Sequence, residues 1–253
     1  MNGTVTSLAY FPIKGMTAHR LDSVTLTPGA GFPGDRQWGF TRPGSGFDPT
    51  APCPLPKHKF VVLVREAELA GVTARLHGDD LHLSHSTGSL DVDLSQEAQR
   101  AAAAAFLQQF LGLDDAPTLV QSDPHRFTDV SVVSPELMNA VSILSLSSVA
   151  DFGSRIGERV DPGRFRMNCA VEGWPPWEEL EDIGREIQLG TVRLKTLLRT
   201  QRCAATEVNP ATANRDLPVP RLLRQHLGHL DLGVYAEVIE GGEIRPGDPA
   251  VLL

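Results

Sequence analysis

Short β-branched runs separated by glycine and proline residues restrict the fold of this chain more than any other feature of its sequence. The runs at 5–10 and 24–27 partly alternate apolar with polar residues, and Pro28-Gly29 and Pro33-Gly34 then interrupt the chain. Short strands bounded by turn residues at this spacing are typical of a small barrel or sandwich. The strands expected before residue 95 cover 5–10, 24–27, 36–41, 60–65, 72–76, 81–84 and 90–94.

Helical patterns are few and lie far apart in the sequence. An alanine-rich stretch from Ser95 places Ala102, Phe106 and Phe110 on one helical stripe, and Gly112 follows as a stop signal. Because helices do not alternate regularly with strands, a parallel βαβ sheet is disfavoured and a β-rich α+β fold is predicted. The other expected elements are helices that start near 145–148 and cover 219–227, and strands from 118 and at 166–172, 186–199 and 234–239.

The composition narrows the class of protein. Hydrophobic residues make up 41% of the chain and charged residues 21%, a balance typical of a folded soluble protein. A net charge of −8 argues against a general nucleic-acid binder, which needs a basic surface. The sequence contains no apolar run of roughly 18 residues and no signal-peptide pattern at its start, so we expect a cytoplasmic protein that does not span a membrane.

Cys203 is the cysteine whose surroundings indicate chemistry. The other two, Cys53 and Cys169, lie far from it in the sequence, and no CxxC pair is present, so neither a disulfide framework nor a structural zinc site is expected. Cys203 follows a strand-like run and lies next to Arg202 and near Arg199. A neighbouring guanidinium favours a thiolate, which attacks electrophiles or binds soft metals. The alternative is a small buried apolar side chain.

A lysine beside a glycine turn forms a second candidate. Lys14 precedes Gly15, and Asp35 and Arg36 follow about twenty positions later, after Gly34. A cation next to a glycine turn suits an anion that approaches the backbone closely. A solvated lysine on a hairpin and a surface Asp35–Arg36 ion pair are the alternative, and such pairs contribute little.

The segment 164–169 has alternating polar and apolar residues. If it is a strand, Arg164, Arg166 and Asn168 share one face, which can bind a phosphate or a flat heterocycle, and Cys169 faces the core as a structural residue. An ordinary solvated strand face explains the same pattern.

Three serines mark the start of the second expected helix. The hydroxyls of Ser145, Ser147 and Ser148 and the free N–H groups of a helix start are able to bind an anion, although simple capping explains them equally. The histidines, His125 among them, have no HxxxH or HxH spacing, so no histidine metal site is inferred.

Taken together and in their order, these segments resemble the MOSC superfamily, the molybdenum cofactor sulfurase C-terminal domain proteins. The resemblance runs nearly from end to end. Within this superfamily the layout is similar to the amidoxime-reducing molybdenum enzymes and their bacterial relatives. It rests on Tyr10–Met16 (YFPIKGM), Thr27–Gly29, Gly34–Trp38 (GDRQW), Arg164–Asn168 (RFRMN), Arg202-Cys203 with Thr206 and Pro210, and Gly247–Pro249.

The resemblance implies an N-terminal β-barrel-like region packed on a MOSC β-barrel, with few helices and a cofactor in the cleft between them. The implied boundaries are 1–94 for the N-terminal region, 95–117 for a helical connection and 118–253 for the MOSC domain. The implied cofactor is a molybdenum–pterin group of the molybdopterin type, in which Cys203 is the protein ligand to the metal and the catalytic residue. The residues implied to hold the pterin and its phosphate are Lys14, Arg36, Ser147, Ser148, Arg166, Asn168 and Arg202.

The resemblance also implies an activity, the reduction of the N–O bond of small N-hydroxylated substrates. The chain carries no cysteine cluster of a ferredoxin module, so electrons would come from a separate partner, a reductase or an electron carrier. The alternative is a carrier of sulfur, as a persulfide on Cys203, or of the molybdenum cofactor itself. A relative that kept the barrel and lost the cofactor is a third possibility. Gly15 stands where many relatives have serine, which removes one hydroxyl from the implied phosphate site.

Overall fold

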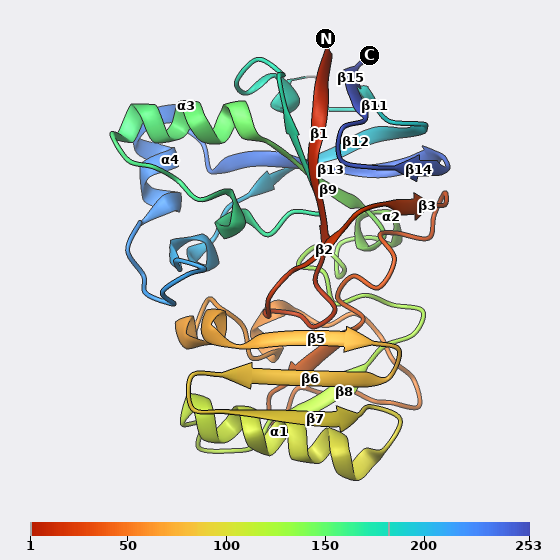
Figure 1. The fold of residues 1–253 in the computed structure, drawn as a ribbon, viewed down its shortest axis with the longest axis vertical. Helices are drawn as coiled ribbons and strands as arrows, with labels where there is room; N and C mark the ends of the chain where they lie inside the picture. Colours follow the sequence, from red (N-terminus) through yellow and green to blue (C-terminus); the bar gives the residue numbers. More distant parts are fainter. Residues whose placement is uncertain (1, 182) are drawn as a thin grey trace.

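The computed structural model describes residues 2–181 and 183–253 of the chain, which fold into two packed bodies (Figure 1). The larger body is a β-barrel flanked by two helices, and the smaller body, drawn below it, is a sheet covered by one helix. The predicted β-rich α+β fold with a barrel and few helices is confirmed. In the described part of the chain, no helix has the length and apolar character needed to cross a membrane.

Seven strands close the barrel in the order β10-β9-β13-β12-β11-β15-β1, and β1 pairs back onto β10. The first strand of the chain is therefore part of the same barrel as the strands of its second half, and β2 extends the sheet beyond β1. Most of these pairs are antiparallel, but β9 and β10 are parallel because helix α3 (Leu146–Ile156) connects them as a crossover. The strands are β1 (Asn2–Tyr10), β2 (His19–Leu21), β9 (Val141–Ser145), β10 (Cys169–Glu172), β11 (Glu186–Leu189), β12 (Val192–Gln201), β13 (Asp231–Glu240) and β15 (Pro249–Leu252).

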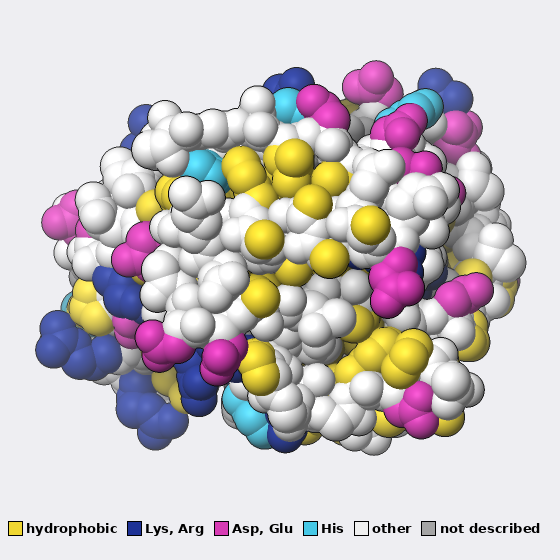
Figure 2. Space-filling view, turned by 90° about the horizontal axis from the view of Figure 1, so that it is seen from below, with side chains coloured by type: hydrophobic (Ala, Val, Ile, Leu, Met, Phe, Trp, Pro, Cys, Tyr) yellow, Lys and Arg dark blue, Asp and Glu magenta, His cyan; other side chains and the backbone are white. Residues whose placement is uncertain are grey.

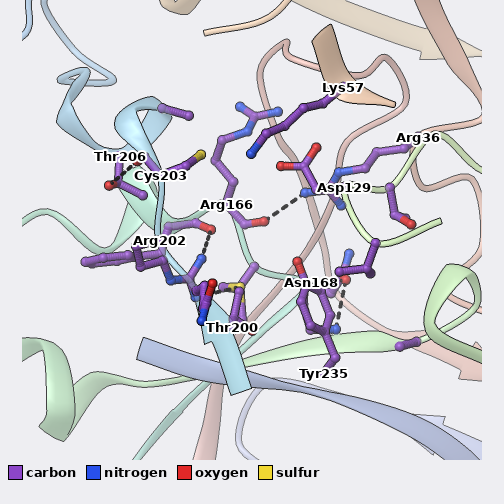
Figure 3. Close-up of a pocket in the computed structure, with 18 of the residues that line it drawn as sticks. Arg36, Lys57, Asp129, Arg166, Asn168, Thr200, Arg202, Cys203, Thr206 and Tyr235 are labelled. Carbon is purple, nitrogen blue, oxygen red and sulfur yellow. Dashed lines mark hydrogen bonds between the residues drawn. The ribbon is translucent and has the colours of Figure 1, made fainter. Parts of the chain in front are cut away.

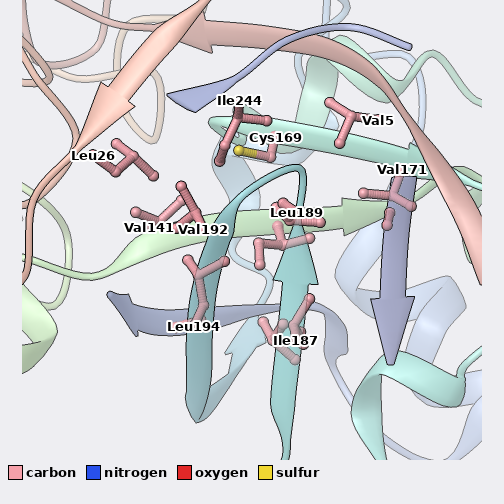
Figure 4. Close-up of a cluster of buried hydrophobic side chains, with 14 of the residues drawn as sticks. Val5, Leu26, Val141, Cys169, Val171, Ile187, Leu189, Val192, Leu194 and Ile244 are labelled. Carbon is pink, nitrogen blue, oxygen red and sulfur yellow. The ribbon is translucent and has the colours of Figure 1, made fainter. Parts of the chain in front are cut away.

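Alternate residues of the barrel strands fill the barrel interior with branched aliphatic side chains (Figure 4). In β12, Val192 and Leu194 are fully buried, whereas the next residue, Lys195, is exposed, because successive side chains of a strand point to opposite faces. Cys169 lies in this core with no exposed surface, and burial raises the pKa of its thiol to about 12. The prediction that Cys169 is structural is thus confirmed.

The smaller body is built from local antiparallel hairpins. A three-stranded sheet is formed by β5 (Thr73–His77), β6 (Asp80–His85) and β7 (Gly88–Asp93), and α1 (Glu97–Leu111) packs on it through Ala103, Ala104 and Leu107. A ladder of β4 (Trp38–Thr41) with β8 (Thr118–Gln121) completes this body. Figure 2 views the molecule from this end, where apolar side chains are visible at the surface. Ala101 and Ala105 of α1 are exposed.

The remaining elements flank or connect the two bodies. The amphipathic helices α3 and α4 pack on one side of the barrel, around Phe152, Val219 and Leu223. They end at Gly157 and Gly228, which adopt the left-handed conformation of a helix C-cap. The bounds of these elements are β3 (Val24–Leu26) paired with β14 (Gly242–Ile244), α2 (Pro135–Met138), α3 (Leu146–Ile156) and α4 (Val219–Leu227).

Three sequence predictions of secondary structure are corrected. Residues 60–65 form no strand and make only an isolated bridge from Phe60 to Thr41. The strand expected at 166–172 begins only at Cys169, because Pro162-Gly163 start a 3-10 turn that continues to Phe165. The single strand expected at 186–199 is the hairpin of β11 and β12, which turns at Gly190.

Candidate functional site

A cavity of about 630 Å³ lies where the barrel meets the smaller body. The N-terminal third of the chain contributes Lys14, Arg36 and Lys57 to its walls, and the barrel side contributes Arg166 and Cys203. In Figure 3 the side chains of Lys57, Asp129, Arg166 and Cys203 converge on the same space. Lys14, Arg36, Arg166, Asn168, Arg202 and Cys203, which the sequence placed at one site, all line this cavity.

Cys203 stands at the point where β12 ends. Its carbonyl accepts hydrogen bonds from the backbone N–H of Thr206 at 3.0 Å and from the Thr206 hydroxyl at 2.8 Å, which fix a 3-10 turn over Ala204–Glu207. Arg215 holds this turn against the smaller body, since its guanidinium donates to the carbonyls of Ala204 and Leu63. The thiol is free and partly exposed to the cavity, so it is accessible as a ligand or nucleophile.

Arg36 and Arg166 form a pair of guanidinium groups on one aromatic ring. Their central carbons lie 4.5 and 4.4 Å from the centre of the Phe11 ring, and Phe11 itself is buried. Arg36 also donates to the carbonyl of Arg166 at 3.0 Å and forms an ion pair with the buried Asp35. The ring and these contacts hold two cations side by side at one end of the cavity.

The backbone at both arginines is strained. Arg36 has φ of 51° and Arg166 has φ of 54°, in the left-handed region that side chains other than glycine rarely adopt. Such residues cost about 1–3 kcal/mol each and are concentrated at ligand sites. Burial, followed by the nearby Arg36, lowers the pKa of Arg166 to about 9. Its buried Nη2 has no hydrogen-bond partner among the described residues, so Arg166 is prepared to bind an anion.

Lys14 is buried and already has partners. Its Nζ donates to the carbonyl of Phe127 at 2.8 Å and to Oδ1 of Asp129 at 2.5 Å. Burial lowers the pKa of Lys14, which Asp129 opposes. Burial would raise the pKa of Asp129, but Lys14 and then Lys57 and Arg36 outweigh it and hold that pKa well below its usual range. An anion in the cavity therefore meets Lys14 and Arg36 as ion pairs with Asp129 and Asp35, and Arg166 and Lys57 as cations without an ion-pair partner among the described residues.

Gly15 has a structural reason to lack a side chain. Its φ is 87°, and a Cβ added there would lie 2.9 Å from a methyl carbon of Leu69 and 3.2 Å from the carbonyl oxygen of Val61. The turn after Lys14 thus excludes a side chain in this conformation.

Arg202 is a structural clamp whose guanidinium is fully occupied. Nε and Nη2 both donate to the carbonyl of Leu232, and Nη1 donates to the carbonyl of Phe165 at 3.1 Å. Nη2 also contacts the sulfur of Met167. The side chain of Arg202 thus ties the segment before Arg166 to the barrel, and its role in holding a phosphate stays a prediction.

Asn168 has a similar structural role. Its Oδ1 accepts from the hydroxyl of Ser142 at 2.6 Å and from the Ser142 N–H, and its Nδ2 donates to the carbonyl of Ala9 at 3.2 Å. These bonds fix the chain directly after Arg166 between two barrel strands. Asn168 therefore lines the cavity but positions Arg166 instead of offering a free amide.

Arg164, Arg166 and Asn168 do not share the face of a strand, which corrects the sequence interpretation. Arg164 lies in the 3-10 turn Pro162–Phe165 and donates to the carbonyl of Glu207 and to the carboxylate of Asp216. The left-handed conformation at Arg166 then reverses the chain before β10. Of the three, Arg166 leaves a terminal guanidinium nitrogen, Nη2, without a partner among the described residues, whereas Arg164 leaves only its Nε unpaired.

Ser147 and Ser148 are not among the residues that line this cavity, and their contact with the cofactor stays a prediction. The helix α3 has Ser145 as its N-cap, with its hydroxyl accepting from the N–H of Ser148. The buried hydroxyl of Ser148 donates to Oε2 of Glu179 at 2.7 Å and accepts from the N–H of Trp177. Capping and internal hydrogen bonds account for these serines.

Four cavity or site residues were missed by sequence reasoning: Phe11, Lys57, Asp129 and Tyr235. Phe11 could have been found from the sequence, because it lies in the same YFPIKGM run as Lys14, three positions before it. Lys57 lies in a proline-rich loop and Asp129 in a connection after a short strand, where no sequence pattern indicates which way a side chain points. Burial and then Asp129 raise the pKa of Tyr235, whose ring lines the cavity.

The fold and site define a class: a β-barrel protein with a cavity that is lined by clustered cations and a free thiol. A family model of the MOSC domain matches residues 123–251, and a model of the MOSC N-terminal beta barrel domain matches residues 2–119. The chain belongs to the MOSC domain family.

Several curated proteins are similar to the chain. Mitochondrial amidoxime-reducing component 1 of Mus musculus is 33% identical over 174 residues, which cover 60% of this chain and 50% of that protein. Molybdenum cofactor sulfurase of Drosophila mojavensis is 23% identical over 254 residues, 90% of this chain and 31% of that protein. The chain thus spans half or less of the length of these relatives. Among solved structures, the YUAD protein of Bacillus subtilis matches with a TM-score of 0.48 and 14% identity, covering 99% of this chain and 94% of that one.

Proposed function

We propose that this protein is a molybdenum cofactor-binding oxidoreductase that reduces N-hydroxylated compounds. The observation that carries the proposal is the free thiol of Cys203 in one cavity with the unpartnered guanidinium of Arg166. The similarity to proteins named amidoxime-reducing components supports the reaction class.

The residues present fit a molybdenum–pterin cofactor. A thiolate is a soft ligand suited to such a metal, and Cys203 would supply it. Arg36, Arg166 and Lys57 would hold the anionic phosphate of the pterin, because guanidinium groups pair with phosphate through two parallel hydrogen bonds. Arg202 and Asn168 would hold Arg166 in place through the backbone on either side of it.

The proposed reaction consumes two protons and two electrons: the N–O bond of an amidoxime breaks, an amidine forms and the oxygen leaves as water. The bound cofactor would supply the oxygen-accepting, two-electron redox chemistry. The chain itself would position the substrate near Cys203 and exclude bulk water from the cavity. A separate reductase or electron carrier would deliver the electrons.

The test is molybdenum and pterin analysis of protein from a molybdenum-replete host, for wild type, Cys203→Ala and Cys53→Ala. Cys53 is an exposed free cysteine and does not line the cavity, so it is the matched control. We expect near-stoichiometric molybdenum and pterin in wild type and Cys53→Ala, loss of the metal and of amidoxime reduction in Cys203→Ala, and unchanged circular dichroism in all three. Full molybdenum content and turnover in Cys203→Ala would refute the role of Cys203.

A second function, a carrier of sulfur or of the molybdenum cofactor, has support from the similarity to molybdenum cofactor sulfurase over 90% of the chain. In that case Cys203 would carry a persulfide. Cyanide-labile sulfur on wild type and Cys53→Ala but not on Cys203→Ala, in protein without molybdenum, would favour the carrier. Amidoxime turnover with an electron donor would favour the oxidoreductase.

A further inference from the structure

The mouth of the Cys203 cavity carries two large apolar side chains that are exposed. Ile183 is 43% exposed and Leu198 is 41% exposed, and both line the cavity that also contains the thiol. Among the described residues, the other large hydrophobic side chains with comparable exposure are Val132, Val133 and Leu253, and none of them lines it. Isolated exposed leucines are common on proteins, and what distinguishes Ile183 and Leu198 is that both line the cavity.

The two side chains come from segments that are hydrogen-bonded to each other. The N–H of Gly184, next to Ile183, donates to the carbonyl of Thr196 at 3.0 Å and to its hydroxyl at 2.9 Å. Arg199, next to Leu198, donates to the carbonyl of Leu180 at 2.7 Å. Ile183 and Leu198 therefore belong to one rim of the cavity, held by hydrogen bonds of neighbouring residues that do not involve the side chains of Ile183 and Leu198.

The strand β12 is irregular where it presents Leu198. Its register with β13 shifts between Thr196 and Leu198 and again between Arg199 and Gln201. Leu194, Thr196 and Thr200 are buried, whereas Leu198, which the period of two would also place inside, is exposed. Bulges reorient side chains and are frequent next to active sites. The register shifts thus expose Leu198 at the cavity mouth, where a regular strand would bury it.

The smaller body contributes further apolar residues to the lining of this cavity. Val62, Leu63 and Val64 of the smaller body line the same cavity, and Arg215 fixes the carbonyls of Leu63 and Val64 at 2.7 and 2.8 Å. An elongated apolar group entering toward Cys203 would contact these residues and the rim of Ile183 and Leu198.

We propose that Ile183 and Leu198 bind an uncharged alkyl or aryl substituent of the substrate, so that the preferred substrates are N-hydroxylated compounds with an extended apolar group. This inference rests on the proposed function. The cations at the Phe11 end of the cavity hold the cofactor, and the apolar rim selects the substrate at the mouth.

The test uses unbranched aliphatic amidoximes from the methyl to the pentyl compound, with cofactor-loaded wild type, Ile183→Ser, Leu198→Ser and Leu253→Ser. Leu253 is 52% exposed and lies outside the cavity, so it is the matched control. A partly buried methylene changes affinity about twofold, so kcat/KM should rise roughly tenfold to twentyfold along the wild-type series. The ratio of kcat/KM for the pentyl compound to that for the methyl compound should fall to about threefold in Leu198→Ser and Ile183→Ser, because the added methylenes then bury less apolar surface. The ratio should remain at the wild-type value in Leu253→Ser.

Each outcome decides the matter. A pentyl-to-methyl ratio unchanged in both rim variants would overturn the proposal. An equal loss for every chain length, corrected by more electron donor, would assign the rim to donor docking and also overturn it. If loaded wild type reduces no member of the series, the proposed function fails, and calorimetric binding of the same amidoximes tests the rim alone. If Kd decreases with chain length in wild type and Leu198→Ser removes this dependence, the apolar binding role of the rim is supported. If Kd does not depend on chain length, that role is overturned.

Discussion

Two buried arginines that line the cavity, Arg202 and Arg166, have opposite roles. Arg202 adjoins Cys203, and each nitrogen of its guanidinium donates to a neighbour: the carbonyl of Leu232, the carbonyl of Phe165 or the sulfur of Met167. Arg166 stacks on the Phe11 ring and leaves Nη2 buried without a partner among the described residues. The first arginine stabilises the fold, and the second is held in a strained conformation with unused capacity to donate.

The difference shows that burial of a cation does not identify a binding site. Arg164 and Arg126 are also buried, yet both donate to backbone carbonyls: Arg164 to Glu207, and Arg126 to Phe32 and Ala30. A binding arginine is recognised by the acceptors it lacks. On this criterion Arg166, whose terminal Nη2 is unpaired among the described residues, is the candidate anion contact, whereas Arg164 and Arg126 leave only Nε unpaired. Arg36 stacks beside Arg166 on Phe11, and Arg202 supports the segment before Arg166.

The largest expected effect comes from removing the clamp. Arg202→Met leaves the buried carbonyls of Leu232 and Phe165 without donors and removes a buried charge partner of Glu179. We expect the free energy of unfolding to fall by about 4 kcal/mol. Urea denaturation followed by fluorescence measures it, and Arg221→Met, at an exposed position on α4, is the control that should stay within about 0.5 kcal/mol of wild type. A loss in Arg202→Met no greater than in the control would contradict the clamp.

Glu179 offers a second way to sharpen the comparison, because it is the buried acid near Arg202. It is 1% exposed, Ser148 donates to its Oε2, and burial raises its pKa to about 7, partly opposed by Arg202. Between pH 4.5 and 7 the folded state therefore binds more protons than the unfolded state, so stability falls as pH rises through this window. In the limit the loss is about 3 kcal/mol.

Glu179→Gln should remove this pH dependence. We expect the free energy of unfolding of wild type to decrease between pH 5 and pH 8 relative to that of the variant by up to about 3 kcal/mol. Denaturant titrations at four pH values across this range measure the difference. Glu181→Gln, a neighbouring exposed carboxyl, should keep the wild-type slope. Parallel curves for wild type and Glu179→Gln would show that Glu179 titrates normally in the folded protein.

The sequence predicted the residues that gather at the cavity better than what each one does there. Arg36, Arg166 and Cys203 were grouped correctly because the order of motifs along the chain resembles a family, although they lie far apart in sequence. Alternation failed at 164–168 because a 3-10 turn and a left-handed residue replace the expected strand. The free donor on Arg166 and the saturated one on Arg202 depend on which carbonyls lie nearby, a fact of tertiary structure.

The fold shows the same division. The alanine-rich stretch and Gly112 predicted the bounds of α1 to within a few residues, because helix propensity and stop signals are local. The predicted stripe was partly wrong: the buried face is Ala103, Ala104 and Leu107, Phe106 and Phe110 are half-buried, and Ala102 is exposed. The membership of β1 in a barrel made mostly from the second half of the chain has no local signal. It follows from long-range pairing of Val5 with Val171 and of Thr4 with Pro249.

The smallest of these effects concerns the free arginine itself. Arg166→Gln keeps a polar side chain next to Phe11 but removes the charge and the paired donors. Because few contacts of Arg166 support the fold, we expect a change in unfolding free energy below about 1 kcal/mol and a loss of cofactor or phosphate affinity of about tenfold, the effect of one charge-assisted hydrogen bond. Calorimetry with inorganic pyrophosphate on cofactor-free protein measures the affinity, at two salt concentrations.

Arg164→Gln is the informative comparison for this variant, since Arg164 lines the same cavity but is bonded to Glu207 and Asp216. It should lower stability more than Arg166→Gln and pyrophosphate affinity less. The reversed order, with Arg164→Gln weakening the anion and Arg166→Gln weakening the fold, would mean that the unpartnered Nη2 of Arg166 does not mark the anion site. In that case the left-handed backbone at Arg166 would serve the turn into β10, and the search for the phosphate contact would move to Lys57, which shares the cavity.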